Sequence, residues 1–242
     1  MNGSLRVSRS GFLAPQSRPA PVPVPMPAPR VEHPPVVIAP PGETIKEGAY
    51  SATFPARRIE AETPLNSGEQ IRLTVEVPRR GYLYVIDREL YSDGSFSRPM
   101  VIFPTRRIRN GDNLVRPGKL IELPNQTDQP PYFVIKRSRQ DQVSEVLTFI
   151  VTTKPLEEIV VGEDQTAIPP ELYASWEKKW LSPAERYEIA GGKGMRYTRK
   201  EEAAGADPDI LLTRSDPSPQ TIYRVSFKPN QPLMVKVPLL IK

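Results

Sequence analysis

The chain has 242 residues, a formal net charge of +5, a pI near 9.4, a single histidine and no cysteine. The missing thiols exclude disulfides, thiolate catalysis and cysteine-ligated zinc or iron–sulfur sites. The charge is only mildly basic, so it favours a basic protein surface over a nucleic-acid-binding protein. No apolar run reaches the roughly twenty residues that a membrane-spanning helix needs. No sequence feature calls for a cofactor.

Residues 1–42 are predicted to form an extended tail. Eleven of the thirty prolines lie between Pro15 and Pro41, and they alternate with small apolar residues from Pro21 to Pro29. Each proline fixes φ and removes a hydrogen-bond donor, which favours a polyproline II conformation. The tail is interpreted as a stalk, as a ligand for an aromatic groove on a partner, or as an inert linker. Residues 43–242 are predicted to form a single β-rich domain.

Alternation of apolar and polar residues begins at Glu69 and predicts a half-buried strand through Val77. An aromatic and β-branched run, Tyr82–Ile86, predicts a central strand. Asp93 and Gly94 supply the positive φ of a hairpin turn, and Met100–Phe103 is the expected returning strand. Three further strands are predicted at residues 119–123, 132–136 and 145–153. Together these short strands predict a mainly β fold, an antiparallel β-sandwich of about seven to nine strands.

A change of period at residues 169–191 predicts a helical insertion, either a helical hairpin or a broken helix packed on the sheet. Trp176 and Trp180 fall on one helical face, which favours packing over ligand stacking. Ser182 opens a capping-box pattern for a second helical segment that ends at the adjacent glycines Gly191 and Gly192. Residues 192–220 are expected to form a long surface loop, and residues 221–242 a C-terminal hairpin.

Catalytic motifs are weak throughout the chain. The only histidine, His33, lies in the proline-rich tail, which argues against a Ser-His-Asp triad and a histidine-ligated zinc site. Residues 191–194 lack a full phosphate-binding loop pattern, so a helix stop is the better interpretation. Asp87, Asp93 and Asp112 lack calcium-loop spacing and are expected to be turn residues. We therefore expect no metal and no enzymatic activity, although a pair of carboxylates for glycoside hydrolysis stays open as an alternative.

Arginine is the clearest chemical bias in the sequence. The candidates for an anion-binding or partner-binding patch are Arg79, Arg80, Arg106, Arg107 and Arg109, with Tyr82 and Tyr84 beside them. Guanidinium groups bind carboxylates and phosphates through forked hydrogen bonds. The alternative is a solvated face that protects a sheet edge from aggregation.

The ordered motifs of the first half resemble one family, the bacterial domain of unknown function 4384, over roughly residues 65–155. The resemblance rests on segments 81–86, 101–104, 108–113, 119–124 and 149–155, which match the family's order of strands and prolines. Thr105 departs from the asparagine that is frequent there. Members of the family are often exported or attached to kinase-like or protease-like domains, which implies an accessory module without catalytic residues.

These observations predict a non-enzymatic binding or scaffold module of a bacterial cell envelope, periplasmic or at the cell surface. The first ten residues contain no apolar core of a signal peptide, so either a signal has been removed or the chain is cytosolic. The expected partner is a protein or an acidic polymer of the envelope, and homo-oligomerisation is compatible with the sequence. Two alternatives stay open: a structural subunit of an envelope assembly or filament that uses its tail, and a carboxylate-dependent cell-wall or polysaccharide hydrolase.

Overall fold

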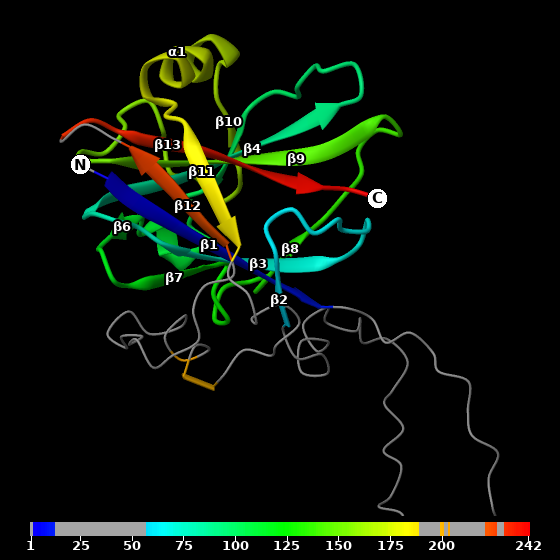
Figure 1. Cartoon of the computed structure of the whole chain (residues 1–242), viewed down its shortest axis with the longest axis horizontal. Coiled ribbons are helices and arrows are strands. Elements are labelled where there is room, and N and C mark those ends of the chain that lie inside the picture. The colour runs from blue at the N-terminus through cyan, green and yellow to red at the C-terminus, as the bar shows by residue number, and fades with distance from the viewer. Residues whose placement is uncertain (1, 13–56, 189–198, 201–202, 204–220, 227–229) are drawn as a thin grey trace, which may run out of the picture.

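Two antiparallel sheets form the body of the protein in a computed structural model, which describes residues 2–12, 57–188, 199–200, 203, 221–226 and 230–242 (Figure 1). The first sheet has the order β11 (Ala184–Glu188), β12 (Thr221–Ser226), β1 (Asn2–Phe12), β3 (Gln70–Glu76) and β7 (Leu120–Leu123), with β2 (Arg57–Ile59) beside β1 and β8 (Phe133–Val134) beside β3. The second has the order β10 (Thr166–Ala167), β5 (Met100–Phe103), β4 (Gly81–Tyr91), β9 (Gln142–Thr152) and β13 (Leu233–Leu240), with β6 (Leu114–Val115) beside β4. The predicted mainly β, antiparallel sandwich is confirmed, but the described residues form thirteen strands, more than the seven to nine predicted.

The main hydrophobic core lies between the two sheets. Alternate residues of β3, among them Leu73 and Val75, face alternate residues of β4 and β9, such as Val85 and Phe149, and all four are at most 1% exposed. Burying side chains of this size contributes about 1.5–3 kcal/mol each. The predicted inward face of β3 is thus confirmed, but the predicted half-burial of this strand is wrong, because Arg72 and Thr74 on its other face are buried too. The strand β9 is buried on both faces, as its apolar pattern predicts.

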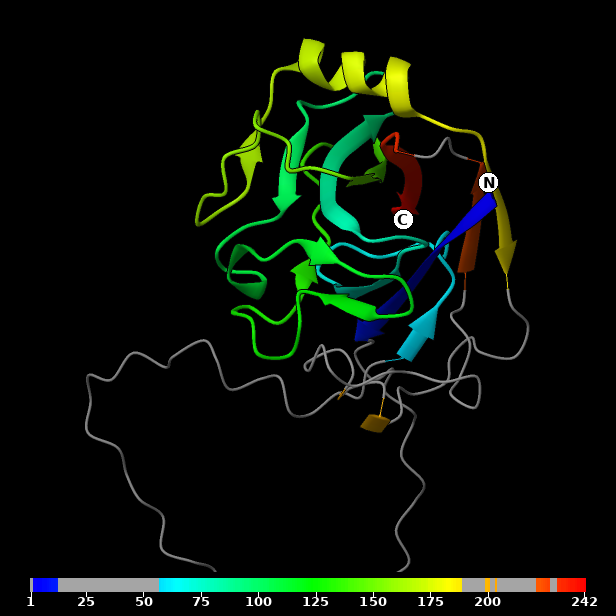
Figure 2. The same ribbon diagram turned by 90° about the vertical axis from the view of Figure 1, so that its left-hand side faces the viewer.

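A second, smaller core covers the outer face of the second sheet. The helix α1 (Pro170–Trp180) lies over this face (Figure 2) and buries Tyr173 and Trp176 against it. Trp176 and Trp180 stack with ring centroids 5.4 Å apart. The helix begins at a proline whose fixed φ suits the first helical position, and Lys178 and Lys179 lie in its last turn, where cations interact favourably with the helix dipole.

The second helical segment predicted after Ser182 is wrong. The chain continues in extended form as β11, which pairs antiparallel with β12 from Ala184 opposite Val225 to Glu188 opposite Thr221. Pairing with a neighbouring strand therefore outweighs the local capping pattern. The predicted helix end at residues 191–192 and most of the predicted surface loop at 192–220 lie outside the described residues.

The prediction of a C-terminal hairpin at residues 221–242 is also wrong. Both predicted strands exist, but β12 belongs to the first sheet and β13 to the second, where Leu233 pairs with Val151 of β9. The two strands therefore do not form a hairpin, and β13 is the edge strand of the second sheet beside β9.

The prediction that the chain begins with an extended tail is wrong for its first residues. Residues 2–12 form β1, which pairs with β12, β2 and β3 in the interior of the first sheet. The remainder of the predicted tail, residues 13–42, lies outside the described part of the chain. The predicted turn between β4 and β5 is confirmed, since Gly94 has φ of +82° and donates to the carbonyl of Tyr91 at 3.0 Å.

Candidate functional site

The predicted arginine patch is divided among several places in the structure. Arg79 lies in the turn between β3 and β4 and donates hydrogen bonds to the carbonyls of Val151 and Gln231. Partial burial lowers the pKa of the Arg79 guanidinium. This side chain therefore ties β9 to the start of β13, whereas its neighbour Arg80 is exposed.

Arg106 and Arg107 follow β5 and form exposed ion pairs with the loop before β10. Arg106 contacts Glu163 at 3.5 Å, and Arg107 contacts Asp164 at 3.1 Å. Exposed pairs of this kind contribute about 0–1 kcal/mol. Both arginines have acidic neighbours, so they are poorer candidates for an external anion than the sequence indicates.

The two predicted tyrosines lie on the other face of the second sheet. Tyr84 is buried in the smaller core, and its hydroxyl accepts a hydrogen bond from the backbone N–H of Leu156 at 2.8 Å. Tyr82 packs against the same core and is half-buried. Both tyrosines support α1 and its neighbouring loop, and neither lines a pocket with the arginines.

A tight turn brings two cations together at the junction of the sheets. Arg116 and Lys119 are the ends of a four-residue turn whose central residues are Pro117 and Gly118. Gly118 has φ of +74°, and the N–H of Lys119 donates to the carbonyl of Arg116 at 3.4 Å. Proline followed by glycine favours this geometry, because proline fixes the first central φ and glycine tolerates the positive second one. The turn links β6 of one sheet to β7 of the other.

A strained loop brings a third cation to the same place. Arg109, Asn110 and Gly111 all have positive φ, at 52°, 52° and 79°. For the first two residues this conformation is uncommon and costly, and such strain often accompanies function. The backbone N–H of Arg109 donates to the carboxylate of Asp128 at 2.9 Å, which holds the loop in place.

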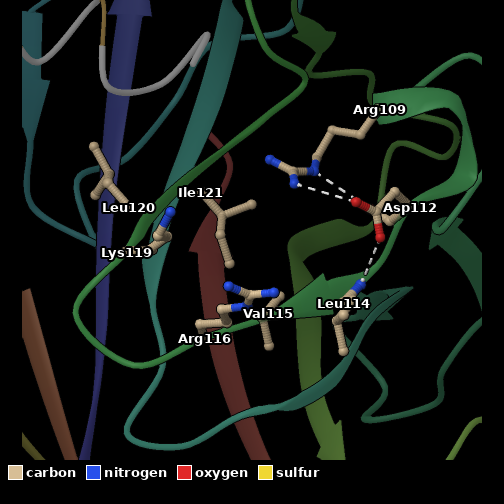
Figure 3. A pocket seen from close by; sticks show the side chains of 8 residues that line it. All are labelled: Arg109, Asp112, Leu114, Val115, Arg116, Lys119, Leu120 and Ile121. Atoms are coloured by element: carbon tan, nitrogen blue, oxygen red, sulfur yellow. Dashed lines mark hydrogen bonds and ion pairs between the residues drawn. The ribbon is translucent and has the colours of Figure 1, made fainter. Parts of the chain in front are cut away.

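Arg109, Arg116 and Lys119 surround a cavity of about 220 Å³ (Figure 3). Asp112 is the one carboxylate in its wall; it contacts Arg109 at 3.9 Å and accepts the N–H of Leu114 at 3.0 Å. The rest of the lining is apolar and comes from the ends of β6 and β7. We call this cavity the cationic pocket. Three cations against one carboxylate give it an excess of positive charge suited to an anionic group.

The sequence prediction found one member of this pocket, Arg109, as an arginine of the patch. Arg116 is not among the predicted patch residues, and Lys119 is predicted only as the first residue of a strand. The Pro117-Gly118 pair is the sequence signal from which the proximity of Arg116 and Lys119 can be predicted, because a turn of this kind brings its first and fourth residues together.

A second group of charged residues was not predicted. Leu83 and Val85 of β4 face the main core, so strand alternation places Asp87 on the same face, followed by Glu89. On β9, Glu145 is directly opposite Glu89. Three carboxyl groups therefore lie on the inner face of the second sheet, beyond the end of the core. The prediction that Asp87 is a turn residue is wrong, because Asp87 lies within β4. Asp93 and Asp112, in contrast, lie in loops and accept hydrogen bonds from the backbone of nearby residues.

Burial and mutual repulsion raise the pKa values of two of these carboxyl groups, Asp87 and Glu145. Desolvation, with a smaller contribution from Glu89, raises the pKa of Asp87 to about 7. Desolvation, with repulsion from Asp87 and Glu89, raises the pKa of Glu145 to about 8. The Oδ1 atom of Asp87 is buried and accepts no hydrogen bond from the described residues. Glu89, by contrast, accepts hydrogen bonds from Tyr91 and Ser138, each at 2.6 Å.

These carboxyl groups form one wall of an open cleft of about 580 Å³, which we call the acidic cleft. Its charged lining residues are Asp87, Glu89, Arg107, Lys136, Glu145, Glu163 and Asp164. The opposite wall contains prolines and aromatic residues, including Pro130, Tyr132 and Phe133. Carboxyl groups thus outnumber cations by five to two. Among the described residues no group of histidine or carboxylate side chains is arranged to hold a metal ion.

Comparison with protein families, with curated proteins and with solved structures finds no match to this chain. In the described part of the chain no helix is long and apolar enough to cross a membrane.

Proposed function

We propose that this protein is a non-enzymatic binding or scaffold module that holds an anionic group of its partner in the cationic pocket. The proposal is supported mainly by one observation: three cations, Arg109, Arg116 and Lys119, line a single cavity that has only one carboxylate in its wall. Guanidinium groups offer forked donors to carboxylates, phosphates and sulfates, and a lysine ammonium adds a point charge.

The size of the cationic pocket narrows the ligand class. A cavity of about 220 Å³ takes one anionic group with a few atoms of its carrier, and cannot take a folded segment. The partner is therefore an acidic side chain of a protein or one repeat of an acidic polymer. The lining comes from residues at the junction of the two sheets, so binding fixes the position of the sandwich relative to its partner.

We propose the bacterial cell envelope, outside the cytoplasm, as the place of action. The absence of cysteine and the proline-rich stretch of sequence between β1 and β2 support this placement. The resemblance to the domain of unknown function 4384 belongs to the same proposal. It covers β3 through β9, the strands and loops that carry both the cationic pocket and most of the acidic cleft.

Binding of polyanions to charge-removal variants tests the proposal. In Arg109→Ala/Arg116→Ala/Lys119→Ala, affinity for a polyphosphate, poly-glutamate or acidic glycan should fall by about tenfold or more at low salt, because contacts to anionic groups are lost. The matched control removes three cations outside the pocket, in Arg106→Ala/Arg107→Ala/Arg137→Ala, and should change the affinity less than about threefold. Equal losses in both variants, or no binding by the parent protein, would contradict the proposal.

A carboxylate-dependent hydrolase is the second candidate, because Asp87 and Glu145 have raised pKa values and line an open cleft. A carboxyl group that stays protonated near neutral pH is suited to general acid catalysis. A screen of purified protein on cell-wall and polysaccharide substrates separates the two candidates. Reproducible turnover that Glu145→Gln abolishes would establish the hydrolase and overturn the non-enzymatic proposal.

A further inference from the structure

We infer that the acidic cleft is a second binding site and takes an alkylammonium group, supplied by a lysine side chain or by a free amine. This site is separate from the cationic pocket, and its ligand has the opposite charge. Three features of the cleft support the inference: its charge balance, an unsatisfied buried acceptor and the apolar residues of its opposite wall.

The charge balance favours a cation. Two of the five acidic residues are paired, Asp164 with Arg107 and Glu163 with Arg106. This leaves the three carboxyl groups of β4 and β9 against a single further cation in the lining, Lys136. Glu89 and Glu145 are directly opposite each other on neighbouring strands, where like charges repel. A bound cation relieves this repulsion, whereas an anion increases it.

The unsatisfied acceptor favours a hydrogen-bond donor. The buried Oδ1 atom of Asp87 has no donor among the described residues, and a buried polar atom without a partner costs about 1–3 kcal/mol. An ammonium group has three N–H donors and no acceptor, so it matches a wall of carboxyl oxygens. A metal ion is a poorer occupant, because the described side chains do not form a coordinating group.

The apolar wall favours an aliphatic stem on that ammonium. Tyr132, Phe133 and Pro130 lie opposite the carboxyl groups in the same cleft. Lysine side chains and alkylamines bury their methylene groups along such surfaces while the charged end reaches a polar partner.

Proton linkage gives this site a distinctive pH dependence. Burial and the neighbouring carboxylates raise the pKa of Asp87 and of Glu145, so both groups are partly protonated at neutral pH. The other charged or titratable groups in the cleft wall are Glu89, Arg107, Tyr132, Lys136, Glu163 and Asp164. An ammonium group, with a pKa of about 10.4, keeps its charge while these carboxyl groups ionise. Affinity for an alkylammonium therefore rises with pH between about 6 and 9, and binding releases protons.

Calorimetric titration of the full chain tests the inference with three probes: 1,5-diaminopentane, a short peptide containing one lysine, and pentane-1,5-diol. The diamine or the lysine peptide should bind saturably at about pH 8.5 and about tenfold more weakly at about pH 6, with proton release. The uncharged diol should not bind. If only the peptide binds, the source is a polypeptide; if the diamine also binds, the cleft accepts free amines.

The variant Asp87→Asn/Glu145→Gln should lose amine binding, while the control Glu157→Gln/Glu158→Gln, which removes two exposed carboxylates outside the cleft, should retain it. Misfolding would not explain the loss, because removing two repelling buried carboxyl groups should raise the melting temperature at about pH 8.5. Binding of polyanions in the cationic pocket should stay within about threefold of the parent, so failure of one site is distinguishable from failure of the other. Absence of saturable amine binding, equal binding of the diol, or unchanged binding by the cleft variant would overturn the inference.

Discussion

Asp87 and Glu145 give the protein a pH-dependent stability whose sign follows from their environment. Their folded-state pKa values, about 7 and about 8, lie above the unfolded values near 4. The folded protein therefore binds more protons than the unfolded chain between about pH 4 and pH 8, and the free energy of unfolding falls as pH rises through this range. Each tenfold change in proton affinity corresponds to about 1.4 kcal/mol, so the total effect is several kcal/mol.

Urea unfolding of the parent and of Asp87→Asn/Glu145→Gln at about pH 5 and about pH 8.5 measures this effect. The parent should lose stability between the two pH values, and the variant should lose much less, since its amides do not titrate. The same slope in both proteins would show that these carboxyl groups do not carry the dependence.

Gly81 illustrates a backbone constraint at the start of β4. A Cβ atom at this position would overlap the carbonyl oxygen of Thr152 on the neighbouring strand. Gly81→Ala should therefore lower the free energy of unfolding by about 1–3 kcal/mol, because the strand pair must separate. Gly162→Ala is the control, since a Cβ there meets ordinary contacts at 3.6 Å. Similar denaturation midpoints for the two variants would contradict this account of β4.

At the scale of elements, α1 is held on the second sheet by two buried aromatic residues, Tyr173 and Trp176. Trp176 is 3% exposed and packs in the smaller core, whereas Trp180 stacks on it from a half-buried position. Trp176→Ala should cost about 3–5 kcal/mol of folding stability, as for other buried aromatic truncations. Trp180→Ala should cost clearly less. Thermal unfolding of both variants measures the difference, and an equal loss would mean that the helix does not pack as described.

Local sequence patterns predict those elements whose environment agrees with them. Alternation in β3 and the apolar run of β9 give their boundaries closely, but only the pattern of β9 reflects its burial, since the polar face of β3 is buried as well. Ser182 fails as a helix signal because β12 offers Ala184–Glu188 a full set of strand hydrogen bonds. Which strands pair is a tertiary property, so the sheets of β12 and β13 could not be derived from their similar patterns.

The two sites differ in how far the sequence predicts them. Alternation beyond Val85 places Asp87 on the core face, but no local sequence pattern predicts that this part of the sheet lines a cleft and not the core. For the cationic pocket, the turn at Pro117-Gly118 is readable, but the positive φ of Arg109 is not, since arginine rarely adopts it. The ion pairs of Arg106 and Arg107 are made with carboxylates of the loop before β10, which is distant in sequence, so the sequence does not predict them.

At the scale of the whole molecule, the first residues complete the sandwich. β1 lies between β12 and β3 in the first sheet, so it carries hydrogen bonds on both edges. Deleting residues 1–12 should expose those two strands and abolish cooperative thermal unfolding. Deleting only Met1 and Asn2 removes a single terminal pair and should change the melting temperature little. A cooperative transition in the longer deletion would show that β1 is dispensable.

Both sites join the two sheets, since the cationic pocket lies where β6 leads into β7 and the acidic cleft is lined by β4, β8 and β9. Binding therefore depends on the intact sandwich and not on an isolated hairpin. A module with one anion-binding and one cation-binding site can hold an acidic and a basic partner together, which suits a scaffold.

The most direct test of the central claim follows the arginine side-chain N–H signals by NMR while a short polyphosphate is added to the full chain. The account predicts that the signals of Arg109 and Arg116 shift together and saturate, and that added salt reverses the shift. Arg106 and Arg107, paired with carboxylates, should shift little. Equal shifts of all exposed arginines without saturation, or shifts confined to Arg106 and Arg107, would contradict the cationic pocket as the binding site.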